Sequence, residues 1–356
     1  MAKKSIKIGI WGIGRAGWGM HIDNELKLFP DEFELTAVCD ILPDRLAEFP
    51  KLYPNVKIYQ DSEEFLNDPE IELVSVAVPS LLHKECTIRA LEKGKYVFNE
   101  KPVALSMEDA MAIKAAEEKH PGKLFFRHNR RFESCFNHIR EIIQSGLIGE
   151  LYQVKLCRHN FDFRADWQTL ISCGGGQLNN WGPHLIDQAL QFLDAPVESV
   201  WSDLKCIAAR GDAEDHLKIL LRAENGRVAD IEISGGVALS SPNYVIYGTK
   251  GSIISEDEQD IKLKYIHPDY VIPEISSSPD TPPRSGSFTG IKPRWVRKTI
   301  MTEPECGWFP GQIYHHLYLA IRENVPFPVK SSQAYEVVRI TSIVKQQNPQ
   351  FLAAKK

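Results

Sequence analysis

The sequence predicts two domains: an α/β domain built on a doubly wound parallel sheet, and an α+β domain with a large, mostly antiparallel open sheet. Strand-like and helix-like stretches alternate up to about residue 127, as in repeated β-α units. Between residues 197 and 254, strand-like runs follow one another and are joined by short turns, which is typical of antiparallel strands. The length of 356 residues also exceeds what one core usually supports. We therefore predict domains at 1–127 and 128–356.

The first strand ends in a glycine-rich turn, in which Gly12, Gly14 and Gly17 have the spacing G-x-G-x-x-G. The first glycine allows a tight turn, the second leaves room for a pyrophosphate, and the third lets the following helix pack closely on the sheet. The N–H groups at the start of that helix are free to bind phosphate. The next apolar run ends in Asp40, at the distance along the chain where the ribose of NAD needs a carboxylate acceptor. The two features together predict a dinucleotide-binding Rossmann domain.

A carboxylate at Asp40 would repel the additional phosphate of NADP, so we expect NAD in preference to NADP. Arg45, one helical turn further on, would weaken this preference. Ligands of parallel sheets bind at the carboxyl ends of the strands, a rule that selects the glycine turn, Asp40 and the segments 79–80 and 100–101. The same rule separates Lys101 from the surface lysines, because it follows a strand directly.

The remaining elements of the first domain follow from apolar runs and capping residues. Asp61 and Ser106 each precede acidic residues, as at a helix N-terminus, and Gly94 is placed to end a helix. The apolar run 71–78 suits a strand buried on both faces. The predicted strands are 5–11, 35–39, 56–59, 71–78, 96–98 and 124–126, and the predicted helices are 43–49, 83–93 and those beginning at 61 and 106.

The second domain is predicted from shorter runs and clear turns. Residues 266–310 are rich in proline and serine and lack clear periodicity. A segment of that length is more often a functional or interface loop than a plain connection. The predicted strands are 151–156, 200–208, 216–222, 228–233 and 244–247, and the predicted helices are 133–145, 311–323 and 331–346.

Three consecutive glycines, 174–176, precede a helix predicted to begin near Trp181, and their backbone can press against a ligand. Asn180, His184 and Asp187 are spaced i, i+4 and i+7 and so share one helical face. Beside a nicotinamide, oxidation of an alcohol needs a proton acceptor poised near neutral pH, which a histidine supplies. The structural alternative makes Asn180 a helix cap, His184 a satisfied first-turn histidine and Asp187 an exposed carboxylate.

The glycine turn, the run Glu100-Lys101-Pro102 and the pattern Gly182-x-His184-x-x-Asp187 after the glycine triplet together resemble the Gfo/Idh/MocA oxidoreductase family. The segments 78–83, 129–132 and 248–251 are also similar to that family. The likeness covers the whole chain apart from the segment 266–310. It is specific for the family and poorly specific for the substrate.

The resemblance implies that Lys101 lies beside the nicotinamide and the substrate hydroxyl, and that His184 is the acid/base. His184 would take the hydroxyl proton as hydride leaves carbon, and the Lys101 ammonium would stabilise the developing alkoxide. The second domain would carry the substrate pocket and, on its open sheet, the interface of a homodimer or homotetramer. The residues expected at the cofactor are Gly12, Ile13, Gly14, Arg15, Ala16, Asp40, Ile41, Pro79, Ser80, His83, Glu100 and Lys101.

The sequence departs from the family at Asn180, because the family commonly has an aspartate four residues before the histidine. Asparagine can donate a hydrogen bond but holds no charge, so it would not raise the pKa of His184 as a carboxylate would. Two explanations stay open: the substrate needs a neutral donor, or the proton relay is altered.

The segment 158–167 is dense in polar and aromatic side chains, among them Arg164 and Trp167. Such a composition suits sugar hydroxyls, which bind through hydrogen bonds at their edges and an aromatic face, and it equally suits an ordinary edge strand and loop. The residues expected at the substrate are Lys101, Arg164, Trp167, Asn180 and His184.

Composition and charge exclude several classes of function. The net charge is −5 and no basic block is present, so we expect no nucleic-acid or membrane partner. No signal-peptide-like region and no apolar run of membrane length occurs, so we expect a cytoplasmic protein. The seven cysteines are scattered without a C-x-x-C, and Cys157 with His159 is too small a set for a metal, so we expect neither a disulfide framework nor a metal site.

We therefore expect an NAD(P)-dependent dehydrogenase that transfers hydride between nicotinamide and a secondary alcohol of a sugar, polyol or glycoside. One alternative is a glycosidase or lyase with tightly bound NAD, in which transient oxidation of a sugar carbon acidifies its neighbour and allows elimination before re-reduction. Another is a nucleotide-binding sensor without catalysis. The pair of Lys101 and His184 argues against a sensor, whereas Asn180 keeps that alternative open.

Overall fold

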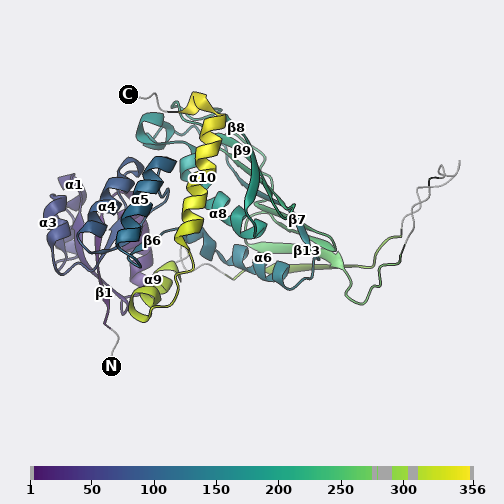
Figure 1. The fold of residues 1–356 in the computed structure, drawn as a ribbon, viewed down its shortest axis with the longest axis horizontal. Coiled ribbons are helices and arrows are strands. Elements are labelled where there is room, and N and C mark those ends of the chain that lie inside the picture. The colour runs from purple at the N-terminus through teal and green to yellow at the C-terminus, as the bar shows by residue number, and fades with distance from the viewer. Residues whose placement is uncertain (1–3, 275–278, 280–290, 304–311, 353–356) are drawn as a thin grey trace.

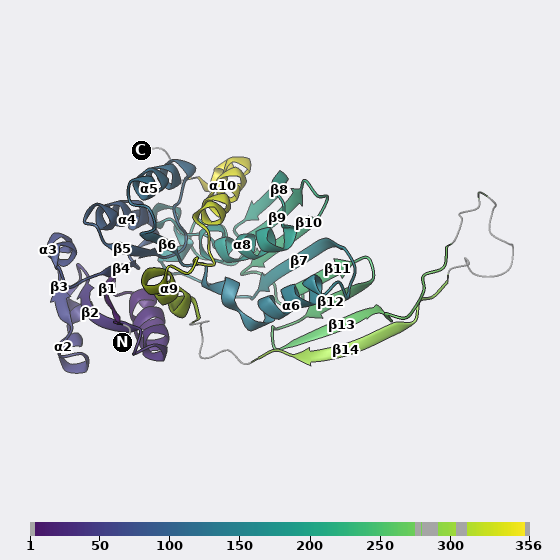
Figure 2. The same ribbon diagram turned by 60° about the horizontal axis from the view of Figure 1, so that its bottom comes forward.

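The computed structural model describes residues 4–274, 279, 291–303 and 312–352. Two sheets lie toward opposite ends of the molecule, and the long helix α10, Ser331–Gln347, runs between them (Figure 1). A hairpin of two strands, β13 and β14, extends along the outer edge of the second sheet (Figure 2). The predicted combination of a doubly wound domain and a largely antiparallel one is confirmed.

The first sheet has six parallel strands in the order β3-β2-β1-β4-β5-β6. The chain starts at the middle of the sheet and builds outward to both sides, so a crevice forms at the carboxyl ends of β1 and β4. All four residues of β4 are buried, as expected for a strand covered on both faces. The strands are β1 Ile6–Trp11, β2 Phe33–Cys39, β3 Lys57–Tyr59, β4 Leu73–Val76, β5 Tyr96–Asn99 and β6 Leu124–Phe126.

Side-chain caps begin two of the helices in this half. The Asp61 carboxylate accepts from the N–H groups of Glu63 and Glu64, and the Ser106 hydroxyl accepts from the N–H of Asp109. The predicted helix 43–49 is instead two short helices, because Pro50 can stand in a first turn but not inside a longer helix. The helices are η1 Arg15–Glu25, η2 Leu26–Leu28, α1 Pro43–Leu46, α2 Phe49–Leu52, α3 Ser62–Asn67, η3 Ser80–Leu82, α4 His83–Glu92 and α5 Met107–Lys119.

The second sheet has eight strands in the order β14-β13-β12-β11-β7-β10-β9-β8. Neighbouring strands are antiparallel except β7 and β10, which are parallel. Burial alternates along β9 and β13, so one face packs on helices and the other is open. The strands are β7 Leu151–His159, β8 Val197–Lys205, β9 His216–Ala223, β10 Val228–Ser234, β11 Tyr244–Gly248, β12 Gly251–Ser255, β13 Asp260–Ile266 and β14 Trp295–Met301.

Six helices lie along the chain between β6 and β8, two of them before β7 and four after it. They carry most of the residues that the sequence singles out in the second domain. They are η4 Asn129–Phe132, α6 Ser134–Gln144, η5 Trp167–Thr169, η6 Ile171–Cys173, α7 Gln177–Asn180 and α8 Gly182–Leu193.

The prediction that 266–310 is a loop without regular structure is wrong for β14, which pairs with β13 along its whole length. Most of its side chains are exposed, so it lacks the apolar alternation by which a half-buried strand is recognised. Residues 275–278, 280–290 and 304–310 of this segment, with Cys306 among them, lie outside the described residues.

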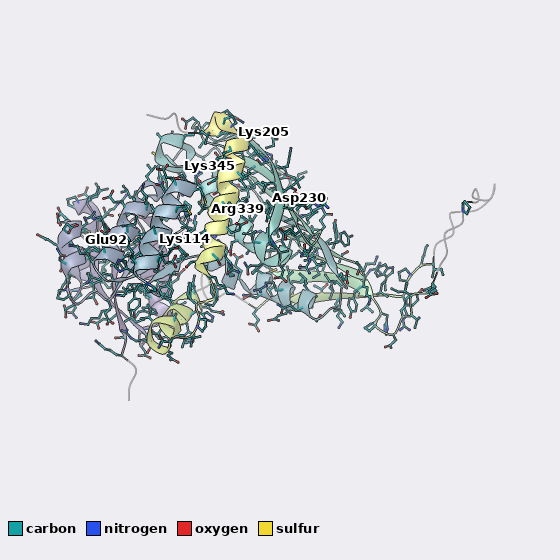
Figure 3. All side chains as sticks on the ribbon, viewed as in Figure 1. Glu92, Lys114, Lys205, Asp230, Arg339 and Lys345 are labelled. Carbon is teal, nitrogen blue, oxygen red and sulfur yellow. The ribbon has the colours of Figure 1, made fainter. Side chains whose placement is uncertain are left out.

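The C-terminal helices join the two halves. Helix α9, Gln312–Glu323, contributes Ile313, Tyr314 and Leu317 to the core of the first sheet. Helix α10 contributes Tyr335 and Val338 to that core and Val337 and Ile340 to the core of the second sheet. Figure 3 shows α10, marked by Arg339 and Lys345, running between the two lobes. The boundary between residues 127 and 128 stays a prediction.

Candidate active site

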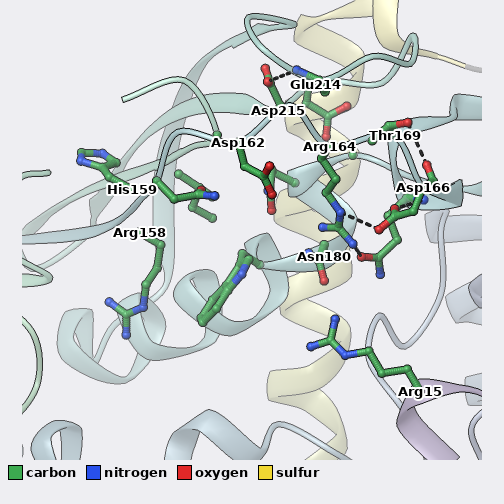
Figure 4. A pocket seen from close by; sticks show the side chains of 18 of the residues that line it. Arg15, Arg158, His159, Asp162, Arg164, Asp166, Thr169, Asn180, Glu214 and Asp215 are labelled. Atoms are coloured by element: carbon green, nitrogen blue, oxygen red, sulfur yellow. Dashed lines mark hydrogen bonds and ion pairs between the residues drawn. The ribbon is translucent and has the colours of Figure 1, made fainter. Parts of the chain in front are cut away.

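Two joined cavities run from the carboxyl ends of the first sheet to the second domain. The cofactor cavity, of about 670 Å³, is lined by the glycine turn, by strand-end residues of the first sheet and by Asn180 and His184. The polar cavity, of about 570 Å³, is lined by Asn160, Asp162, Arg164 and Glu214 among others. Arg15, Arg164 and Asn180 line both, and Figure 4 shows Arg15 entering from the first domain opposite Asn180.

The glycine turn has the geometry of a phosphate cradle. A Cβ on Gly12, whose φ is +99°, would lie 2.6 Å from the Ala77 carbonyl oxygen, and one on Gly17 would lie 2.0 Å from the Gly12 oxygen. At Gly14 the nearest group would be Nη1 of Arg45, 3.8 Å away, so this side of the turn is open. The first and third glycines are therefore needed for the fold, and the second leaves the space that a pyrophosphate requires.

Asp40 follows β2 and binds the glycine turn. Its Oδ2 accepts from the N–H of Ile13 at 2.7 Å and from Arg45 Nη1 at 3.2 Å, while Oδ1 accepts from the N–H of Leu42 at 2.9 Å. Oδ1 keeps acceptor capacity for a ribose hydroxyl. The side chain of Ile13, predicted at the cofactor, is buried and does not line the cavity. Other predicted cofactor residues that line it are Gly12, Gly14, Arg15, Ala16, Ile41, Pro79, Ser80, His83, Glu100 and Lys101.

Lys101 follows β5 and points across the cleft to the second domain. Its Nζ donates to the main-chain oxygen of Asn180 at 3.0 Å and to Asn180 Oδ1 at 3.1 Å. Burial lowers the pKa of Lys101 to about 8, although the charge of Glu100 raises it. An ammonium with such a pKa can hold or release a proton close to neutral pH.

His184 lies in the first turn of α8 and lines the same cavity as Lys101. Its side chain is 7% exposed, and its Nδ1 is buried without a hydrogen-bond partner in the described part of the chain. Burial, followed by the cations Lys101 and Arg130, holds the pKa of His184 well below its ordinary value. The ring is therefore neutral at pH 7 and able to accept a proton.

Asp187, predicted on one face with Asn180 and His184, is not in the site. The helix is interrupted, because α7 ends at Asn180 and α8 begins at Gly182. The spacing in sequence therefore does not place Asn180 on one helical face with His184 and Asp187. Asp187 is 1% exposed and binds Arg131, whose Nε donates to Oδ2 at 3.0 Å and whose Nη2 donates to Oδ1. The alternative of an exposed Asp187 is equally wrong, since the pair with Arg131 is buried.

The glycine triplet packs on protein rather than only on a ligand. A Cβ on Gly175 would lie 2.4 Å from the Gln168 oxygen, and one on Gly176 would lie 2.1 Å from Oε1 of Glu214. Glu214 caps α7 by accepting from the N–H of Leu178, and burial raises its pKa to about 7. The sequence did not single out Glu214, which comes from a distant strand connection and carries no local motif.

Two predicted substrate residues occupy different places. Arg164 lines both cavities, and its Nε donates to Asp166 at 2.8 Å (Figure 4). Trp167 is 46% exposed and lines only the cofactor cavity. Asn160 and Asp162, alternate residues of the segment 158–167, also line the polar cavity. Most of the residues that line the polar cavity carry hydrogen-bond donors or acceptors of the kind that hydroxyl groups use.

His83 and Glu100 bind protein groups at the cavity wall. His83 is buried, and its ring nitrogens lie 2.7 Å from the Pro102 oxygen and 3.0 Å from the Val78 oxygen. This ring connects the chain after β4 to the chain after β5. Glu100 accepts from Arg127 Nη1 at 2.7 Å and pairs with His21 Nε2 at 2.9 Å. His21 and Arg127 were not recognised from the sequence, because the network forms only when distant strands and helices meet.

The described residues contain no metal-binding cluster, no paired cysteines and no membrane-spanning helix. Among them, no group of histidine, cysteine, aspartate or glutamate side chains is arranged to hold a metal ion. The six cysteines that the structure describes are all free thiols, four of them buried. No described helix is long and apolar enough to cross a membrane.

Comparison with known proteins agrees with this geometry. Residues 6–128 match the model of an oxidoreductase family with an NAD-binding Rossmann fold, and residues 136–254 match the GFO/IDH/MocA C-terminal domain. The chain is 28% identical over 342 residues to the scyllo-inositol 2-dehydrogenase (NADP(+)) IolW of Bacillus subtilis, covering 94% of this chain and 92% of that one. It is also 28% identical over 258 residues to the myo-inositol 2-dehydrogenase of Thermotoga maritima, covering 71% and 75%.

Solved structures share the fold. The NAD-binding protein from Listeria innocua has a TM-score of 0.78 and 25% identity, covering 98% of this chain and 96% of that one. The WlbA dehydrogenase from Bordetella pertussis, solved with NADH and UDP-GlcNAcA, has a TM-score of 0.74 and 20% identity, covering 97% of both chains. The two family models together span most of this chain, and its relatives include dehydrogenases. The chain is therefore a member of the GFO/IDH/MocA family of oxidoreductases and an NAD(P)-binding enzyme.

Proposed function

We propose that the protein is an NAD-dependent dehydrogenase that oxidises a secondary alcohol of a sugar or polyol, or reduces the corresponding ketone. One observation carries the proposal: Lys101 from the first domain and His184 from the second line a single cavity that begins at the glycine turn. An ammonium and a neutral imidazole are the groups that alcohol oxidation needs.

The residues divide the chemistry between them. When bound, the dinucleotide supplies the hydride acceptor, held by the glycine turn, Asp40 and the strand ends. The ammonium of Lys101 binds the substrate oxygen and stabilises the charge that develops on it. His184 lines the same cavity and takes the hydroxyl proton as hydride leaves carbon. In the reverse direction His184 returns the proton.

The substrate class rests on the polar cavity and on the relatives. Hydrogen-bonding side chains from Asn160, Asp162, Arg164 and Glu214 line the space beyond Asn180, which suits a molecule with several hydroxyl groups. Two relatives are inositol dehydrogenases, which act on polyols. We also propose that the protein is cytoplasmic, and that it forms a homo-oligomer through the open face of the second sheet.

A spectrophotometric screen tests the function. Purified protein is mixed with NAD⁺ or NADP⁺ and a panel of inositols, aldoses, sugar acids and glycosides, and reduced nicotinamide is followed by its absorbance. We expect cofactor reduction with at least one polyol or sugar. Cleavage of an aryl glycoside without net formation of NADH would instead favour the glycosidase alternative, and binding of NADH without any turnover would favour a sensor.

A further inference from the structure

A buried chain of hydrogen bonds connects helix α9 to the backbone of Lys101. The Tyr314 hydroxyl lies 2.5 Å from His21 Nδ1, His21 Nε2 lies 2.9 Å from Glu100 Oε1, and Glu100 Oε2 accepts from the N–H of Lys101 at 3.1 Å. Tyr314 and His21 are fully buried, and Glu100 is 4% exposed. Water therefore does not compete for these contacts, and each partner is held by the protein alone.

The direction of each bond follows from its acceptor. A carboxylate only accepts, so His21 carries its proton on Nε2 and donates it to Glu100. His21 Nδ1 lies 2.5 Å from the Tyr314 hydroxyl and 3.4 Å from the Ser75 hydroxyl, so two hydroxyl groups face that side of the ring. Glu100 Oε1 has two donors, because Arg127 Nη1 also donates to it at 2.7 Å.

Charge balance explains why the cluster can be buried. Glu25 and Glu100 are the two carboxylates, and Arg127 donates to both. Burial raises the pKa of Glu100 by itself, but Arg127 and His21 outweigh it and hold that pKa well below its ordinary value. Burial raises the pKa of Glu25, the second carboxylate of the cluster. Lys101 contacts no carboxylate oxygen through its Nζ in the described residues.

The same helix serves the cofactor. Helix η1 starts at Arg15, directly after the glycine turn, and carries both His21 and Glu25. The first turn of η1 would face a bound pyrophosphate. The same helix carries His21, which contacts the Glu100 carboxylate next to Lys101. Tyr314 comes from a helix almost 300 residues further along the chain, at a sequence separation of 293 from His21.

We propose that His21 and Tyr314 are positioning residues for Lys101, which act through Glu100 to fix the place and proton affinity of the ammonium. The catalytic role of Lys101 in this proposal rests on the proposed function, whereas the contacts among Tyr314, His21 and Glu100 do not depend on it. The other charged or titratable groups that act on Lys101 come from four elements or their flanking loops, and the test must leave them intact: Arg15, His83, Arg127, His128, Arg130 and His184.

The test compares four variants of the full chain. His21→Met removes the donor to Glu100 at similar volume, His21→Gln restores an N–H donor, and Tyr314→Phe removes one hydroxyl. Tyr318→Phe is the matched control, because Tyr318 lies on the same helix, is 4% exposed and packs against Phe33 as Tyr314 does. Each variant is measured for the Kd of NADH by fluorescence and for kcat with the substrate found in the screen. The proton affinity of Lys101 is read from ¹³C NMR of labelled lysine, with Lys101→Arg assigning the signal.

We expect His21→Met to lower kcat by about 10- to 100-fold and Tyr314→Phe by about 3- to 10-fold, with the Kd of NADH changed less than about threefold. His21→Gln should recover kcat to within about fivefold of the wild type, and Tyr318→Phe should leave it unchanged. Loss of the His21 donor leaves the charge of Glu100 less compensated, so the proton affinity of Lys101 should rise about threefold in His21→Met.

Three results would overturn the proposal: unchanged kcat and proton affinity in His21→Met and Tyr314→Phe, an equal loss in Tyr318→Phe, or a Kd for NADH that weakens as much as kcat falls. If the wild type oxidises no alcohol, the proposed function fails. The NMR signal of Lys101 and the Kd of NADH then still decide whether His21 and Tyr314 control this lysine.

Discussion

The ammonium of Lys101 donates to two oxygens of a single residue, the main-chain oxygen of Asn180 at 3.0 Å and its side-chain oxygen at 3.1 Å. Both acceptors are neutral, so the contact orients Lys101 across the domain cleft without adding a negative charge. Burial lowers the pKa of Lys101 to about 8, and the neutral Asn180 adds no negative charge that would oppose this effect. Asn180 thus acts directly on the lysine.

Asn180→Asp should move the alkaline limb of the pH profile to higher pH. A carboxylate at the place of Oδ1 would raise the pKa of Lys101 above about 8, because an opposite charge at hydrogen-bond distance favours the ammonium by about 1–3 units. Activity that needs the ammonium is present below this pKa and is lost as pH rises through it, so the loss is delayed. The measurement is kcat against pH, with the Kd of NADH as the control, which we expect to change less than about threefold. An alkaline limb that stays in place would remove Asn180 from the site.

The wild-type enzyme should show a bell-shaped pH profile for alcohol oxidation. His184 must be neutral to accept a proton, and its pKa lies well below its ordinary value, so activity falls only as pH drops below 6.5. Lys101 must be protonated, so activity also falls as pH rises through about 8. Initial rates between pH 5 and 10 check both limbs. An acid limb above pH 7 would show that another group serves as the base.

Lys101→Met and His184→Gln should abolish chemistry while the cofactor still binds. Neither side chain holds the glycine turn or Asp40, so the Kd of NADH should stay within about fivefold of the wild type. Loss of the proton acceptor or of the stabilising cation should lower kcat by about 10²- to 10⁴-fold. Stopped-flow measurement of nicotinamide reduction with fluorescence titration of NADH checks both parts. Near-normal turnover in either variant would exclude that residue from catalysis.

Local patterns in the sequence predicted most helices and strands of the first domain, although not the break in the segment 43–52. The spacing of Gly12, Gly14 and Gly17, the caps at Asp61 and Ser106 and continuous apolar runs each depend on neighbours within one β-α unit. The hairpin strand β14 lacks such a pattern, because its side chains are mostly exposed on both faces. Regular structure that is stabilised mainly by backbone pairing leaves little trace in the order of side chains.

The candidate site was predictable only where its residues stand at element ends. Lys101 follows strand β5, and His184 lies in the first turn of helix α8. In α/β folds, ligands bind at such strand and helix ends. The buried partners that shape their surroundings, such as His21, Arg127 and Glu214, have no distinctive neighbours in sequence. Asp187 was misplaced for the same reason, since its partner Arg131 lies 56 residues away and only the fold brings them together.

Arg45→Ala should increase the preference for NAD over NADP. Arg45 is paired with Asp40 at 3.2 Å, and its side chain is 45% exposed and lines the cofactor cavity near Gly14. Arg45 can therefore donate hydrogen bonds to a ribose phosphate that Asp40 alone would repel. The Kd of NADPH should weaken about 10-fold in the variant, and that of NADH less than about threefold. Equal weakening of both would show that Arg45 only supports Asp40, and a wild type that clearly prefers NADPH would overturn the assignment to NAD.

Asp187→Asn should destabilise the fold without changing the chemistry. Arg131 donates to Asp187 and also to the Pro328 oxygen at 3.0 Å and Gln333 Oε1 at 2.7 Å, so the pair connects α8 to the first turn of α10 and to the segment before it. Removing the charge of Asp187 leaves a buried guanidinium without its counter-ion, which costs about 3–5 kcal/mol. The melting temperature measures this loss, and kcat of the folded fraction at low temperature should equal that of the wild type.

Asp23→Asn is the matched control for this stability effect, because Asp23 pairs with Lys27 at 2.8 Å on an exposed helix surface. An exposed pair contributes at most about 1 kcal/mol, so the control should melt close to the wild type. The comparison separates a catalytic role of Asp187 from the structural role of its buried pair with Arg131. A loss of kcat in Asp187→Asn with an unchanged melting temperature would return this carboxylate to the active site, whereas the buried contact with Arg131 requires the opposite result.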